Sequence, residues 1–120
     1  AALRETYEET GLVVGHLDAG HLRPDLKPLE LVARAITPSS SPIRYHARFF
    51  HVNAEHVHGR LRSNGELLDL AWVPLARAAS LPMIDVTEFV LEEVAVRLAG
   101  RTRRSVPLVH YRNRQRLIRR

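Results

Sequence analysis

The sequence predicts an α/β protein, because two segments have the pattern of helices and the segments between them have the pattern of strands. Residues 1–10 form a helical pattern that ends at Gly11, and residues 86–99 form a second one that ends at Gly100. Between them, short runs of aliphatic and β-branched residues are separated by glycine, proline and serine. This order is typical of layered α/β domains rather than of helical bundles or β-sandwiches.

The first half of the chain is predicted to contain three extended stretches after its helix. Residues 12–22 form one strand or two short ones, because glycines at 15 and 20 permit turns. Residues 31–37 form the next strand, and the proline-bounded segment 38–42 forms a loop. Residues 44–52 alternate, which places His46, Arg48 and Phe50 on one side of a strand and Ala47 and Phe49 on the other.

The second half is predicted to contain one more strand and two helices. A polar segment, 53–66, precedes a strand over 67–73 that ends in Trp72-Val73, and Pro74 opens a short helix over 75–80. Asp85 is the expected N-cap of the long helix 86–99, paired with Glu88 in a capping-box-like arrangement. The apolar face of this helix is expected to consist of Val90, Leu91, Val94 and Leu98.

Composition favours a single domain without a membrane span. The chain has 120 residues, 45% of them hydrophobic, no cysteine, and no apolar run near the ~18 residues that a membrane helix needs. We therefore expect a cytoplasmic protein without disulfides or thiolate metal sites. The net charge of +5 is concentrated in residues 101–120, which contain eight arginines and no acid, so the preceding residues are slightly acidic.

The first helix carries three carboxylates on one face, namely Glu5, Glu8 and Glu9, at spacings of i, i+3 and i+4. Like charges at this spacing destabilise a helix by roughly 0.2–0.5 kcal/mol per pair. A hard divalent cation, Mg²⁺ or Mn²⁺, would turn the repulsion into coordination, because such ions prefer carboxylate oxygens. Arg4 can orient Glu8 from one turn away. The opposite face is expected to be core and contains Leu3, Thr6, Tyr7 and Thr10.

Residues 4–12, Arg-Glu-Thr-Tyr-Glu-Glu-Thr-Gly-Leu, resemble the second half of the Nudix box, whose pattern is G-x5-E-x7-R-E-U-x-E-E-x-G-U with U aliphatic. Thr6 departs from the pattern at a U position. The leading glycine and the first glutamate of the box would precede Ala1, so we expect the chain to begin inside the motif, without the N-terminal strands. An isolated 1–120 segment is then expected to be impaired or inactive.

The resemblance also implies a fold and a domain division. Nudix proteins have a mixed β-sheet between helical layers, with the box forming a loop and a helix beside the sheet. The order of helix, strands, Trp72-Val73-Pro74-Leu75 and C-terminal helix is similar here. The resemblance therefore spans residues 1–100, which would form the Nudix-like domain, and leaves residues 101–120 as a basic C-terminal tail.

The activity that the resemblance implies is that of a pyrophosphohydrolase, which hydrolyses a phosphoanhydride in a nucleoside diphosphate linked to another group. Glu5, Glu8 and Glu9 would bind Mg²⁺ or Mn²⁺, and Glu9 and Arg4 would contribute to catalysis. Glu66, six residues before Trp72, is the candidate base, with Glu55 and Asp69 as competitors. Candidate residues of the nucleotide pocket are Arg44, Tyr45, His46 and Phe50.

The histidines and the arginine-rich tail allow other interpretations of the sequence. The seven histidines show no recognised zinc-ligand spacing. Most arginine-rich tails are only solvated, so nucleic-acid binding through residues 101–120, which charge alone supports, is the less expected role. Residues 106–109 would alternatively pair as an edge strand with this sheet or with a second subunit of a homodimer. The main alternative function is a non-catalytic Nudix-fold module that binds a nucleotide, a nucleic acid or a protein partner.

Overall fold

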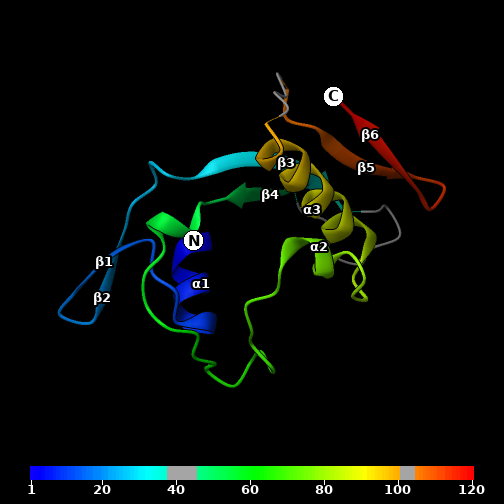
Figure 1. The fold of residues 1–120 in the computed structure, drawn as a ribbon. Helices are drawn as coiled ribbons and strands as arrows, with labels where there is room; N and C mark the ends of the chain where they lie inside the picture. The colour runs from blue at the N-terminus through cyan, green and yellow to red at the C-terminus, as the bar shows by residue number, and fades with distance from the viewer. Residues whose placement is uncertain (38–45, 101–104) are drawn as a thin grey trace. The chain divides into compact units, whose positions relative to one another are not determined.

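The computed structural model describes residues 1–37, 46–100 and 105–120, and it has the α/β class that the sequence predicts (Figure 1). The chain forms two compact units. The first consists of Ala1–Leu29 and Val52–Val73, and the second of Glu30–His51 and Pro74–Arg120. Each unit is described by itself below.

The first unit combines one helix with a β-hairpin. Helix α1 (Ala2–Thr10) is followed by strands β1 (Gly15–Asp18) and β2 (His21–Pro24), which pair in antiparallel register, and a 3-10 turn, η1, spans Ala54–His56. The predicted stretch 12–22 is therefore two short strands, with the turn at Ala19-Gly20. Leu3, Val13 and Val14 are buried in this unit.

The second unit is a four-stranded mixed sheet with a helix on one face (Figure 1). Its strands are β3 (Glu30–Ile36), β4 (His46–His51), β5 (Leu108–Arg112) and β6 (Gln115–Arg119), in the order β4-β3-β5-β6. β3 and β5 are parallel, and the other pairs are antiparallel. The helices are α2 (Leu75–Ala78) and α3 (Asp85–Leu98). The core contains Ala33, Ala35, Val109 and, from α3, Phe89.

Helix α3 differs from the prediction at its start and on its buried face. The N-cap is Ile84, and Asp85 is the first helical residue; the Asp85 carboxylate accepts a hydrogen bond from the Tyr111 hydroxyl at 3.0 Å instead of capping the helix. The predicted apolar stripe is wrong in part, because Phe89 and Glu93 are the buried residues of α3 and Leu98 is exposed. A charged residue thus occupies one of the two buried positions of this helix.

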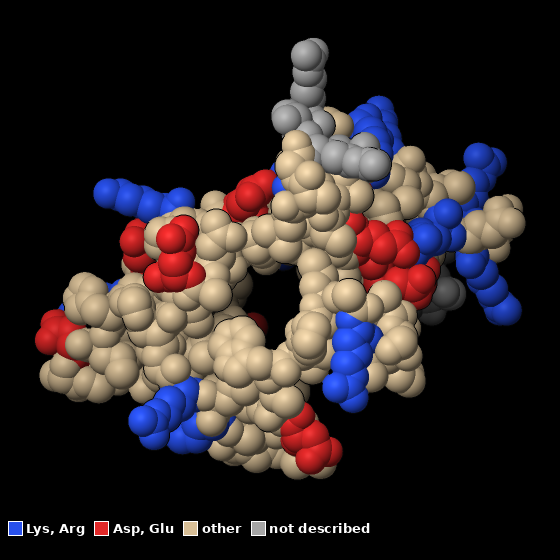
Figure 2. Space-filling model, viewed as in Figure 1, with Lys and Arg blue, Asp and Glu red and all other residues tan. Residues whose placement is uncertain are grey.

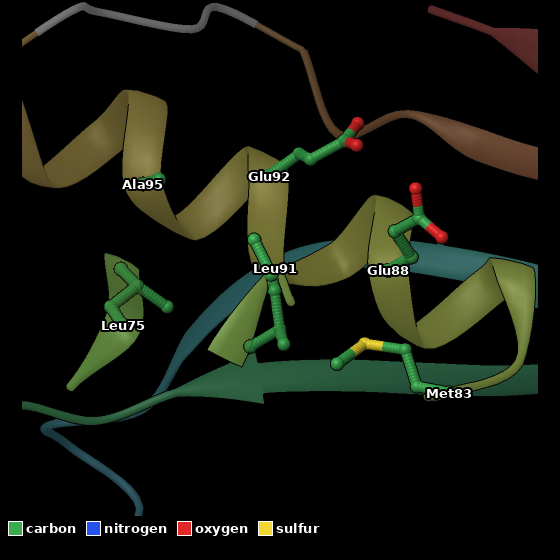
Figure 3. A pocket seen from close by; sticks show the side chains of 7 residues that line it. Leu75, Met83, Glu88, Leu91, Glu92 and Ala95 are labelled. Atoms are coloured by element: carbon green, nitrogen blue, oxygen red, sulfur yellow. The ribbon is translucent and has the colours of Figure 1, made fainter. Parts of the chain in front are cut away.

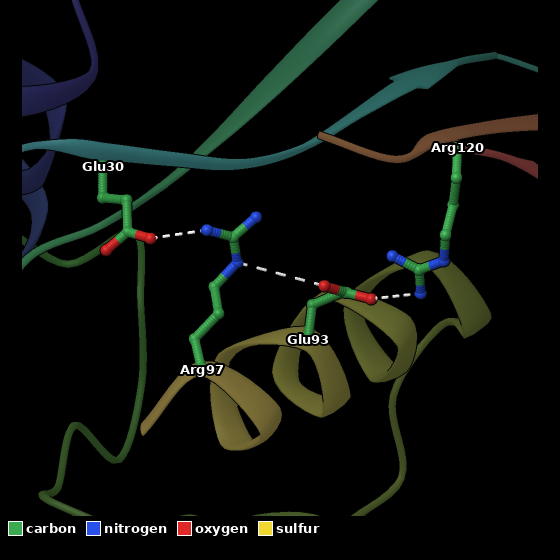
Figure 4. Close-up of polar contacts among 4 residues, drawn as sticks. All are labelled: Glu30, Glu93, Arg97 and Arg120. Carbon is green, nitrogen blue, oxygen red and sulfur yellow. Dashed lines mark hydrogen bonds and ion pairs between the residues drawn. The ribbon is translucent and has the colours of Figure 1, made fainter. Parts of the chain in front are cut away.

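Glu93 is held by arginines from two elements (Figure 4). Its side chain is only 2% exposed, one carboxylate oxygen pairs with Arg120 after β6, and the other lies 3.9 Å from Nε of Arg97. Arg97 also donates to the Glu30 carboxylate on β3 at 2.6 Å. Burial of a carboxylate is costly unless it is paired, so this network connects α3 to both β3 and the end of β6.

Residues 67–73 do not form the predicted strand. The structure assigns them no strand, Asp69 has a positive φ of 55°, and the side chain of Trp72 is 69% exposed. A positive φ is incompatible with extended backbone, and β-forming side chains gain stability in a sheet only when they pack. The strand prediction for this segment is therefore wrong, whereas the short helix that follows Pro74 is confirmed as α2.

Residues 108–119 form the β5–β6 hairpin within the sheet. Its two-residue turn, Asn113-Arg114, has positive φ at both positions, as a tight hairpin of this kind requires. Of the alternatives for the basic segment, pairing with this sheet is the one observed, although β5 is an inner strand because β6 covers its other side. Several basic side chains surround this part of the molecule (Figure 2).

No helix in the described parts of the chain has both the length and the apolar character that crossing a membrane requires.

Candidate functional site

Helix α1 is held in place by its buried face, and its three glutamates lie on the opposite face. Leu3 is buried, and Thr6, Tyr7 and Thr10 are half-buried, as the sequence predicts for that face. The hydroxyls of Thr6 and Thr10 donate to the carbonyl groups of Ala2 and Thr6, four residues earlier. Glu5 and Glu8 are exposed, while Glu9 is half-buried.

The end of α1 is fixed by a close contact between two glycines and their neighbours. Gly11 ends the helix in the left-handed conformation, with φ of 80°, and its N–H donates to the Tyr7 carbonyl at 2.9 Å. A Cβ at Gly11 would lie 2.5 Å from the Arg60 carbonyl oxygen, and one at Gly59 would lie 2.6 Å from the Gly11 carbonyl oxygen. The N–H of Arg62 donates to the Thr10 carbonyl at 2.7 Å, so segment 58–62 lies against the helix end.

Local turns then bring Glu66 back toward α1. The Ser63 hydroxyl accepts from the N–H of Gly65 at 3.0 Å and donates to the Leu67 carbonyl, and the Asn64 side chain accepts from the N–H of Glu66 at 3.0 Å. Serine and asparagine make such turns because their short side chains bond to nearby backbone. Gly59 and Arg62 are positioning residues that the sequence pattern did not predict; the glycine within the polar segment 53–66 was the available signal.

The other three carboxylates act on the pKa of Glu9. The pKa of Glu9 is raised by partial desolvation, then by the negative charge of Glu66, and further by Glu5, by a side-chain hydrogen bond with Glu66 and by Glu8. Glu66 is therefore the predicted base candidate that the structure brings to Glu9. Its competitors are not among these neighbours: Glu55 pairs with His56 at 3.5 Å, and Asp69 lies in the irregular segment described above.

Arg4 lies beside Glu8, as expected for residues one helical turn apart. Its Nε is 4.0 Å from the Glu8 carboxylate, with both side chains more than half exposed. A pair of this kind contributes little to stability, typically 0–1 kcal/mol. Its effect is to restrict where the Glu8 carboxylate lies.

The donor set suits a hard cation in its chemistry, although the carboxylates do not converge on one point. Glu5, Glu8, Glu9 and Glu66 offer only oxygen ligands, and the pKa of Glu9 is raised first by desolvation and then by the other three carboxylates. In the described residues, no group of three or more histidine, cysteine, aspartate or glutamate side chains is arranged to hold a metal ion.

Two of the four residues predicted for a nucleotide pocket lie in the described part of the second unit. His46 and Phe50 belong to β4 in the second unit, and Arg44 and Tyr45 lie outside the described residues. The second unit also contains a small, mainly apolar pocket between α2 and α3 (Figure 3), and neither His46 nor Phe50 is among the described residues that line it. The lining residues are Leu75, Ala79, Met83, Glu88, Leu91, Glu92 and Ala95.

Comparison of the chain with known protein families, with curated proteins and with solved structures gave no match.

Proposed function

We propose that this chain carries the metal-binding helix of a Nudix-type pyrophosphohydrolase that cleaves a phosphoanhydride in a nucleoside diphosphate linked to another group, with Mg²⁺ or Mn²⁺ as the metal. The observation that carries the proposal is the neighbourhood of Glu9. Three box-like glutamates lie on one helix that ends at a left-handed Gly11, and Glu66 lies close enough to Glu9 to raise its pKa.

The arrangement of negative charge supports this proposal over an exposed, solvated helix face. A solvated face would spread its carboxylates, and the chain would gain nothing from returning a fourth one to the same place. Here segment 58–62 contacts the end of α1 through two glycines, and a serine–asparagine turn follows before Glu66. Carboxylates held close together in this way are typical of cation sites and catalytic sites.

Each residue then has a defined role. Glu5, Glu8 and Glu9 would hold the divalent ion, and Arg4 would orient Glu8. When bound, the ion supplies neutralisation of diphosphate charge and a lowered pKa of water. Glu66 would accept the proton that the attacking water loses, and Glu9 would contribute to catalysis as a ligand of the ion.

The test is metal-dependent hydrolysis by the full-length protein. A panel of ADP-ribose, dinucleoside polyphosphates, nucleotide sugars, coenzyme A and oxidised nucleoside triphosphates covers the substrate class. We expect turnover of at least one compound with Mg²⁺ or Mn²⁺, and a loss of about 100-fold or more in kcat when Glu8 and Glu9 are replaced by glutamine. Glu92→Gln, an exposed position on α3, is the matched control.

Two outcomes separate this enzyme from a non-catalytic module. Loss of turnover in the Glu8→Gln, Glu9→Gln variant with nucleotide binding retained supports catalysis. Nucleotide binding by the wild-type protein, without turnover of any panel compound, would contradict the hydrolase and favour the module.

A further inference from the structure

The sheet face opposite α3 carries a row of arginines that the fold does not explain. In the pairing register, Arg48 on β4 lies opposite Arg34 on β3, Arg34 lies beside Leu108 on β5, and Leu108 lies opposite Arg119 on β6. Residues in register share a face of the sheet. Because strands are about 4.8 Å apart, the row of Arg48, Arg34, Leu108 and Arg119 spans roughly 14 Å across all four strands.

Burial shows that this row lies on the side away from the core. The neighbours of the row residues along the strands are Ala33, Ala35 and Val109, which are buried against Phe89 of α3. By alternation, Arg34 and Leu108 point to the other face. On β4 the alternation is equally clear, because Ala47 and Phe49 are half-buried while His46, Arg48 and Phe50 are exposed.

The row is strongly positive and is not neutralised within the described chain. Among the strand residues of this sheet that the structure describes, Glu30 is the only acid, and it pairs with Arg97 of α3. Arg34, Arg48 and Arg119 form no ion pair with any described residue. Like charges directly opposite each other, as at Arg34 and Arg48, destabilise a sheet. Folding stability therefore does not account for this arrangement.

An exposed aromatic ring lies beside the charges. Phe50 is two residues from Arg48 on the same face of β4, and 43% of its surface is exposed. Arginines that track a phosphate backbone, next to an aromatic ring on which a base can stack, are the elements of single-strand recognition. A duplex would need a protruding helix or ribbon to enter its groove, and an acidic peptide would make no use of the ring.

We propose that this face, with Arg34, Arg48 and Arg119 along the backbone and Phe50 against a base, binds single-stranded nucleic acid. The surface lies within the second unit and uses neither the proposed metal ligands Glu5, Glu8 and Glu9 nor Arg4 and Glu66. The binding proposal is therefore independent of the proposed hydrolase activity, and the two can be tested separately.

The experiment is fluorescence anisotropy of the whole protein with labelled 12-nucleotide single strands, measured at several salt concentrations. Binding is expected at low salt, and the slope of log affinity against log salt should fall by about 1.4 in the Arg48→Gln, Arg119→Gln variant, at about 0.7 per lost contact. The matched control, Arg23→Gln with Arg77→Gln, removes the same charge from β2 and α2 and should leave the slope unchanged.

The aromatic contact has its own variants. Phe50→Ala should weaken single-strand binding about tenfold, because a stacked base contributes roughly that much, and Phe50→Tyr should restore it. Far-UV circular dichroism establishes that each variant is folded, and Arg48→Lys with Arg119→Lys should keep the wild-type slope. The proposal is overturned by absence of single-strand binding at low salt, by an equal loss in the control variant, or by equal affinity for a duplex or for polyglutamate.

Discussion

Glu9 is the residue whose chemistry the fold alters most clearly. Its pKa is raised because the surrounding structure removes solvent and places Glu66, Glu5 and Glu8 nearby. A carboxyl group with a raised pKa binds its proton more tightly in the folded than in the unfolded state. Ionised Glu9 therefore lowers the free energy of unfolding at neutral pH. This penalty disappears as the pH falls through the raised pKa toward the ordinary value of 4.5.

Replacing Glu9 by glutamine should remove this penalty. In the absence of divalent cations, we expect Glu9→Gln to be more stable than the wild type at pH 7, with the difference shrinking between the raised pKa and pH 4.5. Urea unfolding at a series of pH values measures the difference in free energy of unfolding between the variant and the wild type. Glu92→Gln, at an exposed site, is the control. A Glu9→Gln variant that is less stable at pH 7 would show that Glu9 makes a favourable contact instead.

At the level of elements, the C-terminal end of α1 determines where the carboxylates lie. Gly11 needs a positive φ and also approaches the Arg60 carbonyl more closely than any side chain permits. Gly20 has a similar φ of 82° in the β1–β2 turn, but no atom lies within 4 Å of a Cβ built there. A substitution at Gly20 therefore tests backbone strain alone, whereas one at Gly11 tests backbone strain together with steric contact.

Alanine at these two glycines should have unequal effects. Gly20→Ala is expected to cost about 1–2 kcal/mol, the ordinary penalty of a left-handed residue. Gly11→Ala should cost clearly more, because segment 58–62 must also move away, and it should reduce the shift in the Glu9 pKa. Chemical denaturation and NMR titration of the glutamate side chains measure the two effects. Equal losses of stability would mean that the contact at Gly11 adds nothing.

Helix α3 depends on its buried carboxylate. Removing one member of a buried ion pair leaves the other unpaired, which typically costs about 3–5 kcal/mol. We expect Glu93→Ala to lose stability in this range, since Arg97 and Arg120 would both lose a partner. The neighbouring exposed residue provides the control, because Glu92→Ala should stay within about 0.5 kcal/mol of the wild type in urea unfolding.

Across the whole molecule, sequence patterns predicted what is local and failed where distant segments meet. α1, β3, the alternation of β4 and the end of α3 follow from periodicity and glycine, so these predictions are confirmed. The cap at Asp85 was mispredicted because its carboxylate bonds to Tyr111, 26 residues away. The buried position of Glu93 was not predicted, and one of its partners, Arg120, lies 27 residues away in the sequence.

The candidate site shows the same division. The helical spacing of Glu5, Glu8 and Glu9 is visible in the sequence, whereas the approach of Glu66 to Glu9 depends on the contact between Gly11 and Gly59. Segment 67–73 has β-forming residues, but a positive φ at Asp69 interrupts it, and no periodicity argument reveals this. The arginine row likewise appears only when the register of four strands is known.

The most direct test of the central claim is manganese binding at α1. The full-length protein is titrated with Mn²⁺ in the presence of a non-hydrolysable diphosphate, and the relaxation rate of water protons is measured at each step. The proposal predicts an enhanced rate that saturates with protein, is retained in Glu92→Gln and is lost when Glu8 and Glu9 are both glutamine. Absence of enhancement in the wild type, or its persistence in that double variant, would contradict the assignment of these carboxylates as metal ligands.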